Sequence, residues 1–380
     1  MALAFWVAAA VAFYTWVGYP ALIALLARWR PAPPVRKAPV EPTVSVVIAV
    51  HNEEDCIEAK LAGCLALDYP ADRLEVVVAS DGSDDQTDAL VAGYAPGRVR
   101  LVRRPRGGKA AALNAGVAEA RGEILVLTDA REELDAGAVR ALVCNFADPL
   151  IGAASGELHL RLPDEPEGGE GFGLYWRYEK AIRRAESAFD STVGVTGALW
   201  ALRRELHVPL DPRTILDDVA LPMEVVLAGF RVVFEPGARV YDTISDAPRR
   251  EYRRKNRTLA GNYQLLALRP ALLDPRRNRL FFQLVSHKVA RLVVPWCLIV
   301  LLPTSAALAS GGGWLYASAL LAQLGFYAVA VGGWLRSRYG RGPRLLDPAY
   351  SIVLLHLAAV TGLLSFLGGG YSRGWKGAGR

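Results

Sequence analysis

The sequence predicts an α/β domain with a largely parallel sheet, set between membrane-spanning helices at the two ends of the chain. The first observation is composition: 52% of the 380 residues are hydrophobic, and the apolar excess lies at the two ends. The second is that strand and helix signals alternate through residues 43–270, which have an ordinary globular composition. A segment of that length can bury a full hydrophobic core.

The amino-terminal residues 2–27 predict a transmembrane anchor. They carry no charge, and the run is long enough to cross about 30 Å of hydrocarbon. Arg28 and Arg30 follow the run, whereas a secretory signal carries its positive charge ahead of it. We therefore expect a retained anchor with its amino end outside and its basic flank in the cytoplasm. Residues 31–42 contain five prolines and predict a stiff linker to the domain.

The carboxyl-terminal residues 292–370 predict three further transmembrane helices. Their apolar runs are Leu292–Ala309, Trp314–Leu335 and Ala349–Gly370. The preceding segment, 276–291, mixes Phe and Leu with Arg and Lys, which is typical of an amphipathic helix in the membrane interface. Arginines in loop 336–348, against glycines in loop 310–313, indicate which side is inside. We expect an integral protein of the cell's inner or plasma membrane, with residues 43–270 in the cytoplasm.

Four apolar runs predict strands of one sheet, and helical patterns separate them. The runs are Val44–Val50, Leu74–Ala79, Val99–Val102 and Glu123–Thr128. Ser83 begins a capping box before one helix, and Lys109–Ala120 is an alanine-rich helix. The order βαβαβαβ indicates parallel strands joined by right-handed crossovers. Ligands of such sheets bind beyond the carboxyl ends of the strands.

Charge and cysteine content narrow the class of protein. The formal net charge is +6, and the basic residues flank apolar segments, which favours contact with membrane lipid. These basic residues lack interleaved aromatic platforms, so we expect no nucleic-acid partner. The four cysteines show no CxxC or CxxH spacing, which indicates reduced thiols and no zinc site.

Polar residues cluster where the predicted strands end and where one predicted helix begins. The clusters are His51-Asn52-Glu53, Ser80-Asp81-Gly82, Gly107-Gly108-Lys109 and Thr128-Asp129-Ala130-Arg131. Each is a weak signal alone, because Asp81 could favour a turn and Asp129 could cap a helix. Their joint occurrence, in this order and followed by Asp217-Asp218, is a strong one. In these motifs the chain resembles the family 2 glycosyltransferases, which have a GT-A fold, from residue 44 to about residue 265.

The resemblance implies a nucleotide-sugar site at the strand ends. Asn52, Glu53 and Asp81 would border the base and ribose, and Lys109 would lie near the nucleotide. Asp129 stands where the family's metal-binding Asp-x-Asp motif begins. A diphosphate leaving group needs its charge neutralised, and Mg²⁺ or Mn²⁺ on a carboxylate does this.

One departure from the family pattern leaves metal dependence open. Position 131 would carry the second acidic residue of the motif, and this chain has Arg131, which cannot bind a metal. Either Asp129 holds the ion together with the diphosphate and water, or Arg131 takes over part of the charge neutralisation.

The remaining motifs concern the acceptor. By the resemblance, Asp218 would be the catalytic base, and Asp217 could cap the helix that begins there. The loop Gly194–Trp200 resembles the one that shapes the acceptor site. Processive members carry Gln-x-x-Arg-Trp near residues 249–257, and here only the arginine, Arg254, is kept. Arg254 would bind the diphosphate, and a lipid-facing or solvated basic run is the plainer interpretation.

The leading hypothesis is inverting transfer of a sugar at the cytoplasmic membrane face, in surface polysaccharide synthesis. The donor would be a nucleotide-sugar, with UDP the expected nucleotide, and the acceptor a glycan or a lipid-linked molecule. One alternative is transfer to a polyprenyl phosphate, which needs no general base. Another, from a different class, is a non-catalytic subunit of a polysaccharide export complex. The sequence leaves the sugar, the acceptor and the choice between processive and single addition open.

Overall fold

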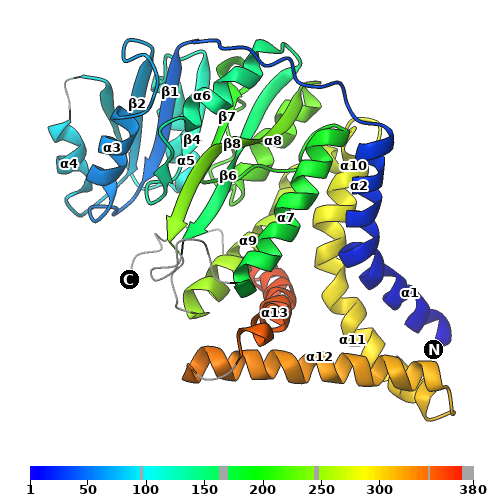
Figure 1. Ribbon diagram of the computed structural model, residues 1–380. Coiled ribbons are helices and arrows are strands. Elements are labelled where there is room, and N and C mark those ends of the chain that lie inside the picture. Colours follow the sequence, from blue (N-terminus) through cyan, green and yellow to red (C-terminus); the bar gives the residue numbers. More distant parts are fainter. Residues whose placement is uncertain (95–96, 162–169, 244–247, 341–342, 370–380) are drawn as a thin grey trace.

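The computed structural model describes residues 1–94, 97–161, 170–243, 248–340 and 343–369. An α/β domain forms one part of the molecule, and long helices from both ends of the chain lie together below it in Figure 1. The predicted third carboxyl-terminal run ends at Gly370, which lies outside the described residues.

One eight-stranded sheet, in the order β3-β2-β1-β4-β7-β6-β8-β5, forms the centre of the domain. Its strands are β1 (Val44–Val50), β2 (Leu74–Asp81), β3 (Val99–Arg104), β4 (Ile124–Thr128), β5 (Glu133–Leu134), β6 (Ile151–Arg161), β7 (Leu199–Arg203) and β8 (Arg231–Thr243). Strands β1 to β4 are mutually parallel, and β6 pairs with β8 in parallel. Strand β7 runs antiparallel to both of its neighbours, β4 and β6. The predicted mostly parallel sheet is confirmed.

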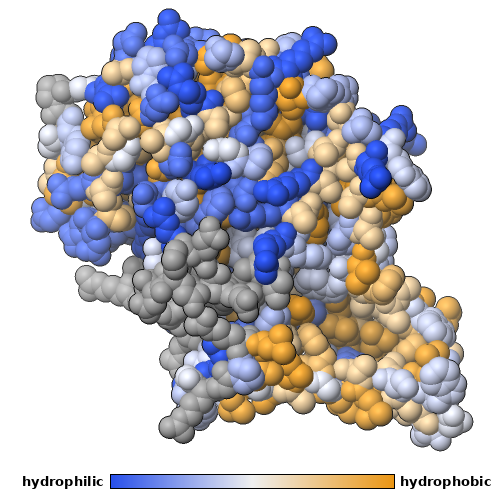
Figure 2. Space-filling view, in the orientation of Figure 1, coloured by the Kyte–Doolittle hydropathy of each residue, from blue (hydrophilic) through white to orange (hydrophobic). Residues whose placement is uncertain are grey.

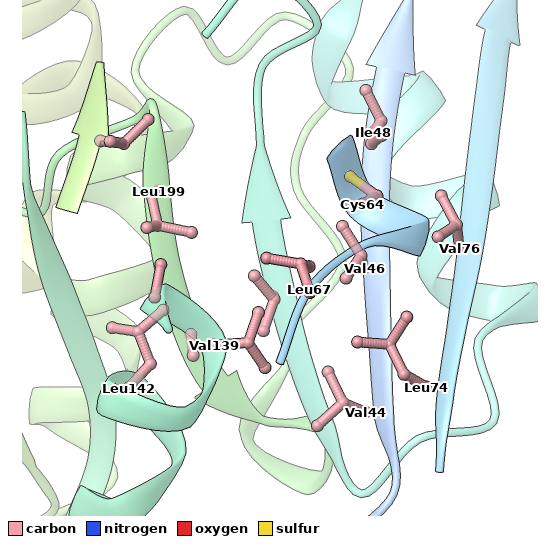
Figure 3. Packing of buried hydrophobic residues seen from close by; sticks show 14 of the residues in the cluster. Val44, Val46, Ile48, Cys64, Leu67, Leu74, Val76, Val139, Leu142 and Leu199 are labelled. Atoms are coloured by element: carbon pink, nitrogen blue, oxygen red, sulfur yellow. The ribbon is translucent and has the colours of Figure 1, made fainter. Parts of the chain in front are cut away.

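Helices cover both faces of the sheet, so the central strands are apolar on both sides. These helices are α3 (Ile57–Leu65), α4 (Thr87–Gly93), α5 (Lys109–Glu119), α6 (Ala138–Val143) and α8 (Asp217–Leu227). Alternate residues of β1 enter opposite cores, because successive side chains of a strand point to opposite faces. Val46 and Ile48 pack toward α3 and α6, as Figure 3 shows with Cys64 and Leu142. Val47 belongs to the other cluster, with residues of α5 and α8.

Four helices are long and apolar enough to cross a membrane. They are Ala2–Trp29 (α1 Ala2–Phe13, a π turn Tyr14–Gly18 and α2 Tyr19–Trp29), Phe281–Ala309 (α10 Phe281–Leu284, a π turn Val285–Val289 and α11 Ala290–Ala309), α12 (Trp314–Tyr339) and α13 (Asp347–Leu367). Figure 2 shows hydrophobic residues gathered over this lower part, while the α/β domain is largely hydrophilic. One amino-terminal and three carboxyl-terminal apolar helices were predicted, and all four are present.

The predicted interfacial helix over 276–291 is not a separate element. Turns precede Phe281, and the rest of that segment is the beginning of the Phe281–Ala309 helix. Buried Asn278 fixes these turns through its side chain. Its Nδ2 donates to the Leu272 carbonyl, and its Oδ1 accepts from the Leu280 N–H. Arg279 is held by the carbonyls of Val226 and Phe230. These contacts lie far away in sequence, so local amphipathicity could not reveal them.

Two long helices join the domain to the apolar helices. They are α7 (Glu170–Phe189) and α9 (Pro248–Leu268). Asn256 of α9 donates to the hydroxyl of Thr361 in α13. A Cβ on Gly362 would lie 3.0 Å from the backbone nitrogen of Ala260, so the two helices touch backbone to backbone there.

Glu186 of α7 is the polar hub between the domain and the apolar helices. It is fully buried, accepts a 2.6 Å hydrogen bond from the Tyr19 hydroxyl and lies 2.7 Å from His287 Nδ1. Two π turns also meet here. The turn Tyr14–Gly18 precedes Tyr19, the turn Val285–Val289 contains His287, and the hydroxyls of Tyr14 and Ser286 lie 2.7 Å apart. Single π turns inside α-helices are frequent at functional sites.

We expect Glu186→Ala to lower the thermal unfolding midpoint of the detergent-solubilised protein by several degrees. Tyr19 and His287 would lose their buried partner, and an unsatisfied buried polar group costs about 1–3 kcal/mol. Intrinsic tryptophan fluorescence during heating measures the change. Glu205→Ala, at an exposed position, is the control and should leave the midpoint unchanged. Equal midpoints for both variants would remove Glu186 as a structural hub.

Candidate active site

The predicted site residues gather where β1, β2 and β4 end. Asn52 follows β1 with a positive φ of 56°, a left-handed conformation that asparagine tolerates. Its side chain exchanges two hydrogen bonds with Asp84, one from Asn52 Nδ2 and one, 3.0 Å long, to Asn52 Oδ1 from the Asp84 N–H. The turns after β1 and β2 are therefore bonded to each other.

Asp81, at the end of β2, is completely buried and organises the glycine loop. Its carboxylate accepts 2.8 Å bonds from the N–H groups of Gly107 and Gly108 and a third from Arg104 Nη1. Gly108 has φ 95°, which a side chain would strain. Both oxygens of Asp81 are thus engaged within the protein, and they fix the loop that precedes Lys109.

Lys109, the first residue of α5, joins the two halves of the site. Its Nζ lies 2.9 Å from Asp129 at the end of β4 and 3.3 Å from Asp217 at the start of α8. Burial alone would lower the pKa of Lys109, but these two carboxylates raise it above its ordinary value. The site therefore contains a permanent cation between the strand ends and α8.

Arg131 forms a forked ion pair with Glu53. Arg131 Nε and Nη2 lie 2.9 and 3.3 Å from the two carboxylate oxygens of Glu53. Glu53 is buried, so this guanidinium neutralises a carboxylate that burial would otherwise penalise. In this structure Arg131 is engaged by the protein itself.

Glu132 is a carboxylate beside Asp129 that the sequence analysis missed. Its Oε2 is buried and has no hydrogen-bond partner among the described residues. Burial, and then the charge of Asp129, raise the pKa of Glu132 to about 7 against the opposing charge of Lys60. A divalent cation shared by Asp129 and Glu132 would satisfy the orphaned oxygen, so the residues present fit such an ion.

The described residues contain no group of three or more His, Cys, Asp or Glu side chains that could hold a metal. Any further ligands of a metal ion at this position would come from substrate oxygens and water.

Asp218 stands in the first turn of α8 and faces the loop that precedes β7. Its carbonyl accepts a 2.9 Å bond from Val195 N–H, and a Cβ on Gly197 would lie 3.6 Å from its carboxylate. Burial and neighbouring Asp217 raise the pKa of Asp218 to about 6, opposed by Lys109, Lys288 and Arg183. A carboxylate with that pKa can accept a proton near neutral pH.

Arg254 lies on α9 with its guanidinium 4.0 Å from Asp242 of β8, and 57% of its side chain is exposed. The charge of Asp129 acts on Asp242, so Arg254 borders the same edge of the sheet. The structure thus brings Lys109, Asp129 and Asp218 into one chain of charges, with Arg254 at its margin.

Sequence reasoning missed two partners in this chain of charges. It treated Asp217 only as a cap, although its position next to Asp218 was a signal of involvement. It had no signal for Glu132, whose backbone carbonyl accepts a bond from Lys60 and whose Oε2 is buried without a partner among the described residues.

The fold and the site define a nucleotide-sugar transferase domain of the GT-A class. Residues 45–208 match the Glycosyl transferase family 2 domain, so this chain carries a family 2 glycosyltransferase domain. A mannosyltransferase from Pyrobaculum calidifontis, solved in complex with GDP-Man and Mn²⁺, superposes with a TM-score of 0.73 and 26% identity. That likeness covers 96% of this chain and 99% of the other, so it includes the apolar helices.

Two curated bacterial relatives are similar in sequence. The probable glycosyltransferase YdaM of Bacillus subtilis is 27% identical over 64% of this chain and 61% of its own length. Poly-beta-1,6-N-acetyl-D-glucosamine synthase of Staphylococcus aureus is 25% identical over 68% of this chain and 63% of its own length. The match therefore spans less than two thirds of either relative.

We expect Asp81→Asn to weaken nucleotide binding indirectly and to destabilise the protein by about 1–3 kcal/mol. The Asp81 carboxylate accepts hydrogen bonds from the N–H groups of Gly107 and Gly108. In the asparagine variant an NH₂ group would replace one of the accepting oxygens, so one of these bonds would be lost and the glycine loop would loosen. Thermal unfolding and titration calorimetry with nucleotide diphosphates measure both effects. Asp72→Asn, at an exposed position, should change neither. Full stability with lost nucleotide binding would instead indicate direct contact with the nucleotide.

Proposed function

We propose that the protein transfers a sugar, with inversion at the anomeric carbon, from a nucleotide-sugar to an acceptor hydroxyl at the membrane surface. The observation that carries this proposal is the position of Lys109 between Asp129 and the Asp217-Asp218 pair. The ammonium group of Lys109 would then act on both the departing diphosphate and the acceptor side of the site. In a GT-A domain that arrangement suits an in-line displacement between two bound substrates.

The donor half would consist of the β1, β2 and β4 ends. Lys109 and the loop fixed by Asp81 supply positive charge and N–H groups for a diphosphate. Asn52, Glu53 and Arg254 border this region. UDP is the nucleotide expected from the family resemblance, and the solved relative carries GDP-Man, so both belong in a donor screen.

Asp129 and Glu132 are the residues that would hold a divalent ion, Mg²⁺ or Mn²⁺. The presence of Mn²⁺ in the solved relative supports this assignment. When bound, such an ion would neutralise charge on the departing diphosphate. Lys109, whose Nζ lies 2.9 Å from Asp129, would add to this neutralisation.

In the reaction, the acceptor oxygen forms a bond to the anomeric carbon while the bond from that carbon to the diphosphate oxygen breaks. The hydroxyl proton passes to the Asp218 carboxylate, and the nucleoside diphosphate leaves with the bonding electron pair. Asp218 is ionised above its pKa of about 6. A base matched to neutral pH favours a hydroxyl acceptor over a phosphate acceptor, because an ionised phosphate oxygen attacks without a general base.

We place the reaction at the cytoplasmic face, in synthesis of a surface polysaccharide. The arginines that follow the first apolar helix support the orientation. Similarity to the poly-beta-1,6-N-acetyl-D-glucosamine synthase supports the product class. Association with export-complex subunits is part of the same proposal.

A screen for nucleotide release from common UDP- and GDP-sugars tests the proposal, and Asp218→Asn tests the mechanism. We expect this variant to lower kcat by about 10²–10⁴-fold while nucleotide affinity stays nearly constant. The wild-type rate should fall below pH 6, because protonated Asp218 cannot accept a proton. Asp211→Asn, on the loop before α8, is the control. Near-normal turnover by Asp218→Asn would favour a phosphate acceptor, and absence of release from every donor would refute enzymatic transfer.

We expect Glu132→Gln to weaken the metal-dependent part of nucleotide binding by about tenfold or more, because the ion would lose a charged oxygen ligand. Calorimetry with nucleotide diphosphate, with and without Mn²⁺, reads this out independently of turnover. Glu133→Gln, one residue further on and exposed, is the matched control. If Glu132→Gln binds nucleotide and Mn²⁺ as the wild type does, Asp129 acts without it.

A further inference from the structure

A pair of cations, Lys288 and Arg183, lies on the acceptor side of Asp218. Lys288 belongs to the π turn of the Phe281–Ala309 helix, and Arg183 belongs to α7. The charges of both act on Asp218. Neither forms an ion pair within the described part of the chain, and Arg183 donates only to the Thr196 hydroxyl, at 2.7 Å. Both side chains are partly exposed.

This pair is distinct from the cation of the donor half. Lys109 is already paired with Asp129 and Asp217, whereas Lys288 and Arg183 come from the helices that join the domain to the membrane part. Thr196 lies in the same loop as Gly197, which adjoins the Asp218 carboxylate. Glu179 and Asp218 act on Lys288 from a distance, but neither cation forms an ion pair in the described part of the chain, which leaves both able to bind an anionic ligand on the acceptor side.

An apolar cavity lies further along the same helix. It has a volume of about 420 Å³ and is lined by residues of all four candidate spans, among them Ala9, Trp16, Leu298 and Phe326. That volume is within the range of about 300–1,000 Å³ typical of small-molecule sites. Its lining is almost wholly apolar, which suits a hydrocarbon chain.

The same helix carries a cation and part of the cavity wall. Val294, Leu298, Leu301 and Ser305 recur at spacings of three and four residues and line the cavity, and Lys288 and Arg291 precede them by one to two turns. Arg291 lies over the Trp16 ring, 5.3 Å from its centre, and Trp16 lines the cavity. Along this helix, Lys288, whose charge acts on Asp218, therefore comes before the apolar cavity.

We propose that the acceptor is a lipid-linked saccharide, with its hydroxyl at Asp218, its bridging phosphate or diphosphate at Lys288 and Arg183, and its hydrocarbon chain in the cavity among the membrane helices. This rests on the proposed glycosyl transfer and adds the class of acceptor. The three chemical parts of such a molecule match the three regions. A phospholipid of the surrounding membrane lacks the saccharide, and a soluble glycan would leave the cations and the cavity without a ligand.

The test uses the full-length protein in phosphatidylcholine nanodiscs and a radiolabelled long-chain isoprenyl diphosphate as the probe. The wild type should bind it in the presence of excess phosphatidylcholine, and the matching isoprenyl alcohol should bind at least about tenfold more weakly. Lys288→Gln should weaken binding by about tenfold or more, because it removes a charged hydrogen-bond donor to the phosphate. Lys288→Arg should restore it.

A matched pair on the first helix tests the cavity. Ala9 lines it, whereas Ala10 is exposed on the outside of the same helix. Ala9→Phe should weaken probe binding by about tenfold or more, and Ala10→Phe should not change it. Equal binding by Ala9→Phe, or equal binding of diphosphate and alcohol, would overturn the proposal.

Two further outcomes separate this inference from the proposed function. If Lys288→Gln weakens binding of free nucleotide diphosphate as strongly as it weakens the lipid probe, the cations belong to the donor site and the acceptor assignment fails. If wild-type protein releases nucleotide from a sugar donor yet binds no probe, glycosyl transfer stands and only the lipid-linked acceptor is refuted.

Discussion

The ammonium group of Lys109 is the contact on which the site depends. A buried lysine is costly unless opposite charges surround it, and Asp129 and Asp217 supply them from two different elements. Asp81 fixes the loop from which this lysine begins α5, by accepting hydrogen bonds from the N–H groups of Gly107 and Gly108. These contacts hold together the ends of β2 and β4 and the starts of α5 and α8. The charges of Asp129 and Asp217 therefore act on the same ammonium group.

The position of this site relative to the membrane follows from a second set of buried polar contacts. Glu186 and Glu179 of α7 engage Tyr19 and His287, which lie on two different apolar helices. The same helix α7 carries Arg183, which bonds to the loop beside Asp218. A shift of the membrane helices against the domain would therefore move the acceptor side of the site, whereas the donor side is built within the sheet.

Local patterns were sufficient for the features that depend on local chemistry. Apolar β-branched runs such as Val44–Val50 predicted the parallel strands, and uncharged runs predicted the four long helices. The antiparallel insertion of β7 between β4 and β6 was not predictable, because it joins Leu125 to Leu202 across a long connection. The helix expected over 276–291 begins only at Phe281, after turns in which Arg279 donates to the distant carbonyls of Val226 and Phe230.

Arg131 illustrates how tertiary contacts alter the meaning of a motif. From the sequence alone, an arginine at the second acidic position indicated either a weakened metal site or a substitute cation. In the fold its guanidinium compensates buried Glu53. The carboxylate with an unsatisfied oxygen is one residue further, at Glu132, where the charge of Asp129 reaches it. An arginine at position 131 is therefore compatible with two acids near this strand end, Asp129 and Glu132, because its guanidinium neutralises Glu53.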